Sequence, residues 1–358
     1  MTLAAMWVHD GAVCAIADSA VTLYEPGRSG PTSVGQKREE SSFRVDEAVL
    51  KLMPIGKVAV VAGAGRGSSV EAFAHHLRSF LQDRMPFHRA IHSAHRRALD
   101  TDLPGAEWDA LVGTFNGDSP QILHCGTDDR GRVFEVRPQF GFIGSARDLL
   151  GPGLLDGLQK SNGSPSSITT SAQAFVYREL AQDAGLFDNG IGGPVFAGAL
   201  HQDGFHWQPD TMIAFCTDEL FENLRGPRSP APDWMLDLVF VGVRDDVGFC
   251  FSTYLSRGKG HAVVRAFHNR LTESPFSWYQ KWEPMLGRAT RNPDRVIFLH
   301  RTRPGICILR DLHSGSPVFA LGEGGRCALH PALVQFVDQG LRVAPGETVD
   351  VRWASALA

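Results

Sequence analysis

The order of short apolar runs, glycine turns and helical patterns in the first 215 residues constrains the fold most strongly. Two apolar runs, Leu3 to Val8 and Ala12 to Ala17, flank His9-Asp10-Gly11, and an Asp-Gly turn between such runs is typical of a β-hairpin. Residues 70–81 then carry apolar side chains at a spacing of three and four, which indicates an amphipathic helix. A second helix is expected at 87–99.

Strand patterns and helical patterns each recur further along the chain. Hairpins are expected at 48–53 with 58–62, 110–115 with 121–125, 132–136 with 140–143 and 194–200 with 205–215, and helices at 146–158 and 168–184. Blocks of strands that alternate with pairs of helices predict an α+β fold with two antiparallel sheets and helices outside them.

A proline-rich segment suggests a domain boundary. Residues 224–233 contain three prolines and few apolar residues, which is typical of a linker. We therefore predict a first domain at 1–215, a linker at 216–233 and a small α+β domain of unknown role at 234–358. In this last part we expect mostly strands and one helix at 263–271. Residues 24–44 are polar and are expected to form a long exposed loop.

The composition excludes several classes of protein. With 35 Lys and Arg against 39 Asp and Glu, the net charge is −4, which provides no general field for nucleic acid or an acidic membrane surface. The 6 cysteines form no C-x-x-C pair, so we expect neither a zinc site nor a dense disulfide framework. Because neither a secretory signal nor an 18-residue apolar run is visible, we expect a cytoplasmic protein without membrane contact.

The first residues carry a possible catalytic group. Thr2 follows Met1, and a small second residue permits removal of the initiator methionine. Thr2 would then combine a hydroxyl nucleophile with a free α-amine, whose reference pKa of about 7.7–8.0 suits a general base near neutral pH. Many proteins begin with Met-Thr, so this pair alone indicates little.

Further motifs follow Thr2 in a characteristic order. They are Ala17-Asp18-Ser19, Lys51-Leu52-Met53, Val61-Ala62-Gly63, Gly144-Ser145 and Asp188-Asn189-Gly190-Ile191-Gly192-Gly193. With Thr2, and with the same separation between Thr2 and Asp18, this series resembles proteasome-type β-subunits and the peptidase of the bacterial heat-shock ring protease. The resemblance covers residues 2–215.

The resemblance implies a four-layer αββα sandwich of the N-terminal nucleophile (Ntn) hydrolase type. It implies that Thr2 attacks a peptide carbonyl, that Lys51 and Asp18 form a charged pair beside it, and that the Gly63 N–H stabilises the oxyanion. Ser145 and Asp188 would position the amine of Thr2.

The resemblance also implies substrates and partners. Val61 and Ala20 stand at substrate-binding positions, and the substrate would be a peptide or protein. Family members assemble, so we expect a homo-oligomer, with a regulatory or ATPase partner as a further possibility.

The sequence departs from the family at several places. Ile191 stands where the family usually has Ser, and Ala20 where many members have Arg. Lys51 lies about twice as far from Asp18 as the family's lysine, because extra residues fall in the loop 24–44; Lys37 is therefore a rival for the lysine role. We prefer Lys51 because it begins an apolar strand. The alternative function is a catalytically inactive scaffold or binding subunit of the same fold.

Two other patterns are weaker. Residues 63–67, Gly-Ala-Gly-Arg-Gly, resemble a dinucleotide-binding turn, but the third glycine comes one place early and no alternating βα units follow. His88, His92 and His95 share one helical face and form a possible metal patch. With Arg89, Arg96 and Arg97 beside them, a solvated basic face is the preferred interpretation.

Overall fold

The structure, a computed structural model, combines helices with mostly antiparallel sheets. It describes residues 2–23, 44–47, 49–101, 107–128, 131–137, 139–160, 163–182, 186, 190–216, 236–254, 261–268, 294–300, 306–310, 319–322, 326–329 and 348–352. The predicted α+β class is confirmed. In these ranges no helix is both long and apolar enough to cross a membrane.

The first sheet contains the chain's opening hairpin. Its strands, in spatial order, are β10 (Phe140–Ile143), β1 (Ala4–His9), β2 (Ala12–Asp18), β11 (Val195–His201) and β12 (Gly204–Trp207). Asp10 and Gly11, which join β1 to β2, have φ angles of 45° and 70°, the left-handed values that a two-residue hairpin turn requires. All seven residues of β2 are buried, so the predicted hairpin lies inside the molecule.

The second sheet lies against a pair of helices. Its strands, in spatial order, are β5 (Leu52–Ile55), β6 (Ala59–Gly65), β7 (Trp108–Asn116), β8 (Ser119–Asp128) and β9 (Gly131–Arg137). Helices α1 (Gly67–Gln82) and α2 (Phe87–Thr101) connect β6 to β7. Val70, Phe73 and Leu77 of α1 are buried with Val61 and Val112 of the sheet, which confirms the amphipathic helix expected at 70–81.

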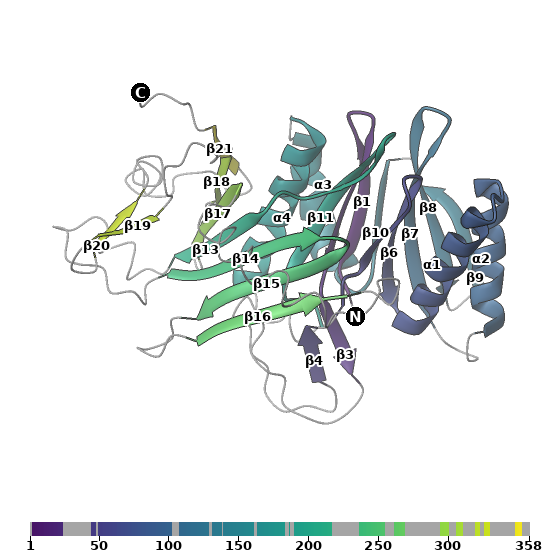
Figure 1. Cartoon of the computed structure of the whole chain (residues 1–358), viewed down its shortest axis with the longest axis horizontal. Helices are drawn as coiled ribbons and strands as arrows, with labels where there is room; N and C mark the ends of the chain where they lie inside the picture. Colours follow the sequence, from purple (N-terminus) through teal and green to yellow (C-terminus); the bar gives the residue numbers. More distant parts are fainter. Residues whose placement is uncertain are drawn as a thin grey trace.

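A second helix pair covers the first sheet. Helix α3 (Arg147–Lys160) contacts β10, and helix α4 (Pro165–Gln182) contacts β2 and β11. The two sheets also contact each other, and a buried cluster joins residues of β1 and β2 to Val60, Leu111 and Ile122 of the second sheet. Figure 1 shows α1 and α2 together at one end of the molecule and α3 with α4 near its middle.

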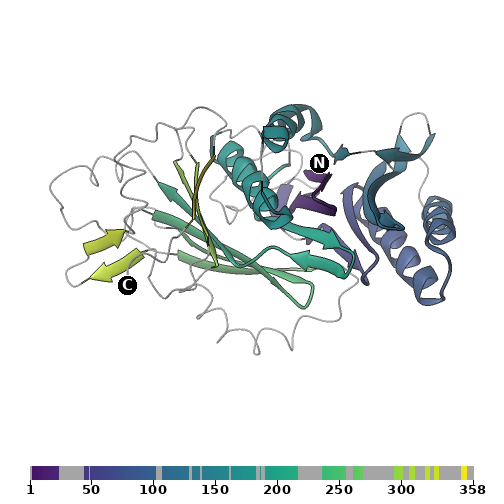
Figure 2. The ribbon, with the colours of Figure 1, turned by 90° about the horizontal axis from the view of Figure 1, so that it is seen from above.

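A third sheet begins within the first predicted domain. Its strands, in spatial order, are β16 (His261–Phe267), β15 (Val247–Tyr254), β14 (Leu236–Arg244), β13 (Thr211–Cys216), β17 (Arg295–His300), β18 (Ile306–Arg310) and β21 (Thr348–Arg352). Figure 2 shows this sheet extending away from α1 and α2. The hairpin expected at 194–200 with 205–215 is wrong in its second half, because β12 ends at Trp207 and β13 joins this other sheet.

The helix expected at 263–271 is also wrong. Residues 261–267 form β16, an edge strand paired with β15 from Gly248↔Phe267 to Tyr254↔His261. The adjacent Val263 and Val264 favour extended structure. Pairing with β15 therefore selects a strand rather than the expected helix.

The predicted domain division stays a prediction. Most of the predicted linker, 217–233, lies outside the described residues, but β13 and β14 on its two sides pair with each other. Phe215, Val241 and Leu299 also belong to the buried cluster that contains β1 and β2. The strands before and after the predicted linker therefore share one sheet and one core.

Two short hairpins complete the description. One pairs β19 (Phe319–Gly322) with β20 (Arg326–Leu329), and the other pairs β3 (Ala20–Leu23) with β4 (Arg44–Glu47). The predicted exposed loop lies between β3 and β4, at residues 24–43, outside the described residues.

Candidate active site

Thr2 lies at the start of β1 and is held from both sides of its main chain. Its N–H donates to Ser145 Oγ at 3.2 Å, and its carbonyl accepts from the Ala146 N–H at 3.3 Å. Gly144 makes this contact possible, since a Cβ at that position would lie 2.1 Å from the Thr2 carbonyl oxygen. Its φ of +89° also favours glycine. Thr2 itself is 4% exposed, so its hydroxyl is sheltered from most solvent.

Asp18, the last residue of β2, is a fully buried carboxylate with three donors. Oδ1 accepts from the Leu3 N–H at 3.0 Å and from Lys51 Nζ at 2.5 Å, and Oδ2 accepts from the Gly192 N–H at 3.1 Å. Three donors around a buried carboxylate satisfy its oxygens and fix its position. Asp18 can therefore orient Lys51.

Lys51 connects this carboxylate to Thr2. Its Nζ also lies 3.2 Å from Thr2 Oγ1 and donates to it. Burial lowers the pKa of Lys51, while the charge of Asp18 and the hydrogen bond to it oppose the shift. Its contacts with Thr2 Oγ1 and Asp18 place the Lys51 side chain where a positive charge would stabilise negative charge on the Thr2 hydroxyl oxygen.

The β3–β4 hairpin explains how a lysine so distant in sequence reaches Asp18. β3 begins at Ala20, just after Asp18. β4 pairs with β3 in antiparallel register, from Ala20↔Glu47 to Leu23↔Arg44. The long loop is thus closed at its base, and Lys51 lies four residues after β4. Lys37, the rival lysine, falls outside the described residues.

Two glycines of β6 face the same site. The Arg66 N–H donates to the Glu107 carbonyl, next to the start of β7. Main-chain N–H and C=O groups alternate between the two sides of a strand, so those of Gly63 and Gly65 are directed away from β7. On that side the pairing with β5 ends at Leu52↔Ala62. Both glycines line the cavity that contains Thr2, so their main chain borders the space beside the Thr2 hydroxyl.

A cavity of about 690 Å³ brings the predicted residues together. Thr2, Lys51, Gly63 and Ala20 all line it, so the predicted nucleophile, its lysine, the oxyanion glycine and one substrate-binding residue share one space. Ser145 joins them through its contact with Thr2. A cavity of this size is typical of sites that bind small organic groups.

Two other predicted site residues, Val61 and Asp188, are not placed in this cavity by the described structure. Val61 is fully buried against α1 and α2 and is not among the described residues that line the cavity. Asp188 lies outside the described residues, while Ile191 nearby is fully buried and donates its N–H to the Leu186 carbonyl.

Sequence reasoning missed Gly65 and the role of Gly192. Gly65 has a φ of +79°, and a Cβ there would lie 2.6 Å from the Glu107 carbonyl oxygen. Its signal was the Gly-x-Gly spacing at 63–65, which suggested a dinucleotide turn instead. That interpretation is unsupported, since β6 and β7, the strands joined through α1 and α2, are antiparallel. The contact from Gly192 to Asp18 had no local signal.

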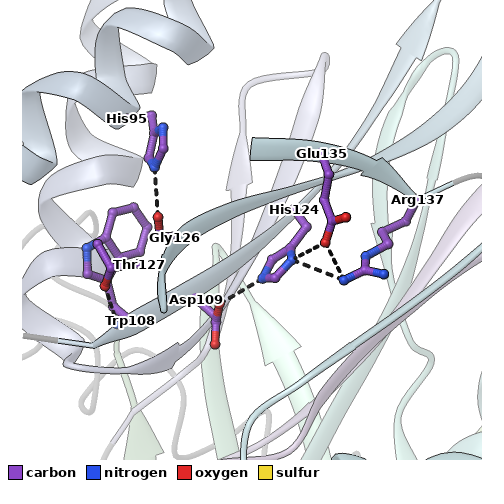
Figure 3. A network of polar contacts seen from close by, with 8 residues as sticks. All are labelled: His95, Trp108, Asp109, His124, Gly126, Thr127, Glu135 and Arg137. Atoms are coloured by element: carbon purple, nitrogen blue, oxygen red, sulfur yellow. Dashed lines mark hydrogen bonds and ion pairs between the residues drawn. The ribbon is translucent and has the colours of Figure 1, made fainter. Parts of the chain in front are cut away.

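The histidines of α2 do not form a metal site in the described part of the chain. His95 is buried and donates to the Gly126 carbonyl at 3.0 Å, and His92 stacks on Phe134 with 4.1 Å between ring centroids. Figure 3 shows His95 together with a second polar network centred on His124.

His124 bridges three neighbouring strands. Its Nε2 lies 2.7 Å from Asp109 Oδ1 on β7, and its Nδ1 lies 3.0 Å from Glu135 Oε1 on β9 (Figure 3). Burial and the charge of Arg137 lower the pKa of His124, but the two carboxylates outweigh them and raise it. The doubly protonated ring can donate to both carboxylates, so this network ties β7, β8 and β9 together.

Comparison with known proteins adds no family assignment. No protein-family model matches the sequence, and a search of curated proteins gives no match. The resemblance to proteasome-type subunits therefore stays a prediction.

Proposed function

We propose that this chain is a threonine peptidase or amidohydrolase of the Ntn class, with Thr2 as nucleophile after removal of Met1. The observation that carries the proposal is the position of Lys51 Nζ, 3.2 Å from Thr2 Oγ1 and 2.5 Å from Asp18 Oδ1. A hydroxyl, a buried lysine and a buried carboxylate in contact form the arrangement that activates a nucleophile.

The fold is compatible with this class. Two stacked sheets, with α1 and α2 on one and α3 and α4 on the other, support a four-layer αββα sandwich. Strands β17 and β18 also contact helix α4. In this chain these later strands therefore lie against the helix layer that covers the first sheet.

The first step forms an ester on Thr2. In the chain with Met1 the Thr2 nitrogen is a peptide amide, and cleavage of Met1 turns it into an amine beside Ser145 Oγ. That amine accepts the Oγ proton as Oγ bonds to the substrate carbonyl carbon, and Lys51 stabilises the developing charge on Oγ. The N–H of Gly63 or Gly65 stabilises the negative charge on the carbonyl oxygen.

The second step releases the product. The amine of Thr2 returns its proton to the leaving nitrogen as the C–N bond breaks, which leaves an acyl ester on Thr2 Oγ. Water, deprotonated by the same amine, attacks the ester carbonyl, and the proton passes to Thr2 Oγ as the acid leaves. The cycle consumes one water and requires no metal or cofactor.

The alternative is a catalytically inactive scaffold or binding subunit of the same fold. The observation in its favour is Ile191, a buried apolar residue where the family places a serine near the amine. The Gly192 N–H to Asp18 supports the active interpretation, because it preserves the carboxylate that orients Lys51.

Intact-mass analysis with an uncharged β-lactone probe separates the two functions. We expect a mature chain that begins at Thr2 and gains one adduct, and a Thr2→Ala variant that gains none. A correctly processed chain that forms no adduct and cleaves no peptide would identify the inactive scaffold.

The resemblance also leads us to propose a homo-oligomer in the cytoplasm that acts on peptides or proteins. Light scattering across micromolar concentrations tests the assembly, and a constant monomer mass would contradict it.

A further inference from the structure

The segment that precedes Lys51 is attached to two different sheets. The Val49 N–H donates to the Ser19 carbonyl at 3.5 Å, just beyond the end of β2. The Leu50 N–H donates to the His268 carbonyl at 3.2 Å, just beyond the end of β16, and Val49 forms a parallel bridge with His268. Successive N–H groups of an extended chain point to opposite sides. One side of this segment is therefore held by the first sheet and the other by the third.

The side chain of Leu50 adds to the attachment to the third sheet. Leu50 is fully buried in the same cluster as Phe196 of β11 and Phe267, the last residue of β16. The rings of Phe196 and Phe267 meet edge to face, with 5.3 Å between their centroids. Gly248 of β15 leaves room for this packing, since a Cβ there would lie 2.7 Å from the Phe196 ring and 3.3 Å from Leu50 Cδ1. Apolar packing and a main-chain hydrogen bond thus join Leu50 to β15 and β16.

This attachment bears on the site because Lys51 follows Leu50 directly. Lys51 precedes β5 and lies outside the strands, so its position depends on what holds the residues before it. Its Nζ lies 3.2 Å from Thr2 Oγ1 and 2.5 Å from Asp18 Oδ1. A displacement of about 1 Å at a catalytic group can reduce a rate by a factor on the order of 10². A link that fixes Leu50 therefore fixes the point from which Lys51 extends.

We propose that the third sheet is part of the catalytic unit, and that Leu50 and His268 are positioning residues for Lys51. The inference deepens the proposed hydrolase function and rests on it. It gives a role to the predicted domain at 234–358, whose role the sequence leaves unknown. The end of β16 holds the segment from which the lysine reaches Thr2.

Phe267→Ala tests this link from the side of the third sheet. The substitution removes the ring that packs against Phe196, and it changes none of the described residues that line the cavity. We expect His268 to shift with the end of β16 and its hold on Leu50 to loosen. In the mature full-length chain, kcat for a peptide amide should fall by about tenfold while KM stays within about twofold. The reason is that Lys51 acts on charge that develops in the transition state.

Phe240→Ala is the matched control in the same sheet. Phe240 of β14 is 1% exposed and Phe267 is 0% exposed, so the two substitutions remove equally buried rings. Val239 and Val241, on either side of Phe240, belong to the buried cluster described above, whereas Phe240 itself stacks on Phe249. Because side chains alternate along a strand, Phe240 lies on the opposite face of the sheet. The control should lose a similar amount of stability in urea and keep its kcat.

Acylation of Lys51 measures how firmly the lysine is held, independently of catalysis. Acetic anhydride is applied briefly to the folded chain, and peptide mapping by mass spectrometry gives the rate at each lysine. Lys51 is 8% exposed and Lys57 is exposed, so Lys57 serves as the reference within each sample. Phe267→Ala should raise the rate at Lys51 relative to Lys57 by about tenfold, because a weakened link opens more often. Phe240→Ala should leave this ratio unchanged.

The two measurements separate failure of this inference from failure of the proposed function. A folded Phe267→Ala chain with wild-type kcat would overturn the inference and leave the hydrolase intact, whether or not Lys51 acylation rises. Equal changes in Phe267→Ala and Phe240→Ala would also overturn it, since they would reflect a general loss of stability. If the wild-type chain forms no β-lactone adduct and cleaves no peptide, the proposed function fails and the catalytic role of the sheet fails with it. Acylation then still shows whether the third sheet holds Lys51.

A milder variant covers the case in which Phe267→Ala does not fold, as judged by circular dichroism. Phe267→Leu removes less volume and keeps an apolar side chain at the end of β16. It must lower kcat and raise the acylation of Lys51 in the same direction, by smaller factors. A folded Phe267→Leu chain with wild-type values of both would overturn the inference.

Discussion

Two networks in this chain pair a titratable cation with carboxylates, and they differ in burial. Lys51 and Asp18 are 8% and 0% exposed. His124 is 12% exposed, but its partners Asp109 and Glu135 are 35% and 44% exposed. The first network therefore lies in the interior beside Thr2, whereas the second joins three strands near the surface (Figure 3).

The two cations shift their pKa in opposite directions. Burial lowers the pKa of Lys51, and its one carboxylate does not compensate. Burial also acts to lower the pKa of His124, but hydrogen bonds to two carboxylates raise it overall. In this chain the deeply buried cation with one carboxylate partner has a lowered pKa, and the less buried cation with two carboxylate partners has a raised pKa. The first arrangement suits chemistry and the second suits structure.

The largest expected effect comes from removing the proposed nucleophile, which contacts the buried network. Thr2→Ala should reduce kcat/KM for a peptide amide by at least about 10³-fold, because no other hydroxyl in the described residues receives a hydrogen bond from Lys51. Thr2→Ser should keep part of the activity, since it retains the hydroxyl and the amine. Cleavage by Thr2→Ala at the wild-type rate would place the nucleophile elsewhere.

Removal of the lysine should affect both rate and stability. Lys51→Met should lower kcat/KM by roughly 10²- to 10⁴-fold and leave Asp18 as a buried unpaired charge, which costs about 3–5 kcal/mol in the free energy of unfolding. Denaturant unfolding and peptide cleavage measure the two effects.

A second variant separates the electrostatic loss from the chemical one. Lys51→Met combined with Asp18→Asn removes the unpaired charge, so it should recover part of the stability but none of the activity. Lys37→Ala is the control and should remain active. An inactive Lys37→Ala beside an active Lys51→Met would reverse the assignment of the lysine.

Gly144→Ala should disturb Thr2 without touching Lys51. The new Cβ would lie 2.1 Å from the Thr2 carbonyl oxygen, so Thr2 must shift, and we expect a loss of about tenfold or more in kcat/KM. Gly117→Ala is matched in backbone strain, with φ of +61°, but its Cβ meets nothing within 4 Å. It should cost about 1–2 kcal/mol of stability and leave kcat/KM unchanged. Equal losses of activity would attribute the effect to strain alone.

The smallest effect is expected in the second network and depends on pH. Because the pKa of His124 is raised in the folded chain, its contribution is fully present below the unfolded value of about 6.5 and is lost as the pH rises through the folded value. His124→Gln should therefore destabilise the chain by about 1 kcal/mol more at pH 5.5 than at pH 9. Unfolding in urea at both pH values measures the difference, and a larger loss at pH 9 would show that the histidine is stabilising when neutral.

Local patterns in the sequence were sufficient for several elements near the site. The Asp10-Gly11 turn requires left-handed backbone, which glycine permits, so the hairpin of β1 and β2 could be predicted from these residues. The apolar spacing of 70–81 predicted α1, because a helix brings side chains three and four apart to one face. Thr2, Asp18, Lys51 and Ser145 were predicted as site residues from the resemblance to proteasome-type subunits, and hydrogen bonds join them in the structure.

Tertiary structure decided what local patterns left open. Residues 261–267 pair as β16, and β13 leaves its expected hairpin partner for another sheet, because pairing between strands outweighs weak local preferences. The carboxylate of Asp18 receives a hydrogen bond from Gly192, 174 residues away in the sequence. Such a contact has no periodicity or spacing that reveals it, since it forms only when distant segments pack together. The residues that we propose for catalysis could thus be named from the sequence, whereas their mutual geometry came from long-range packing.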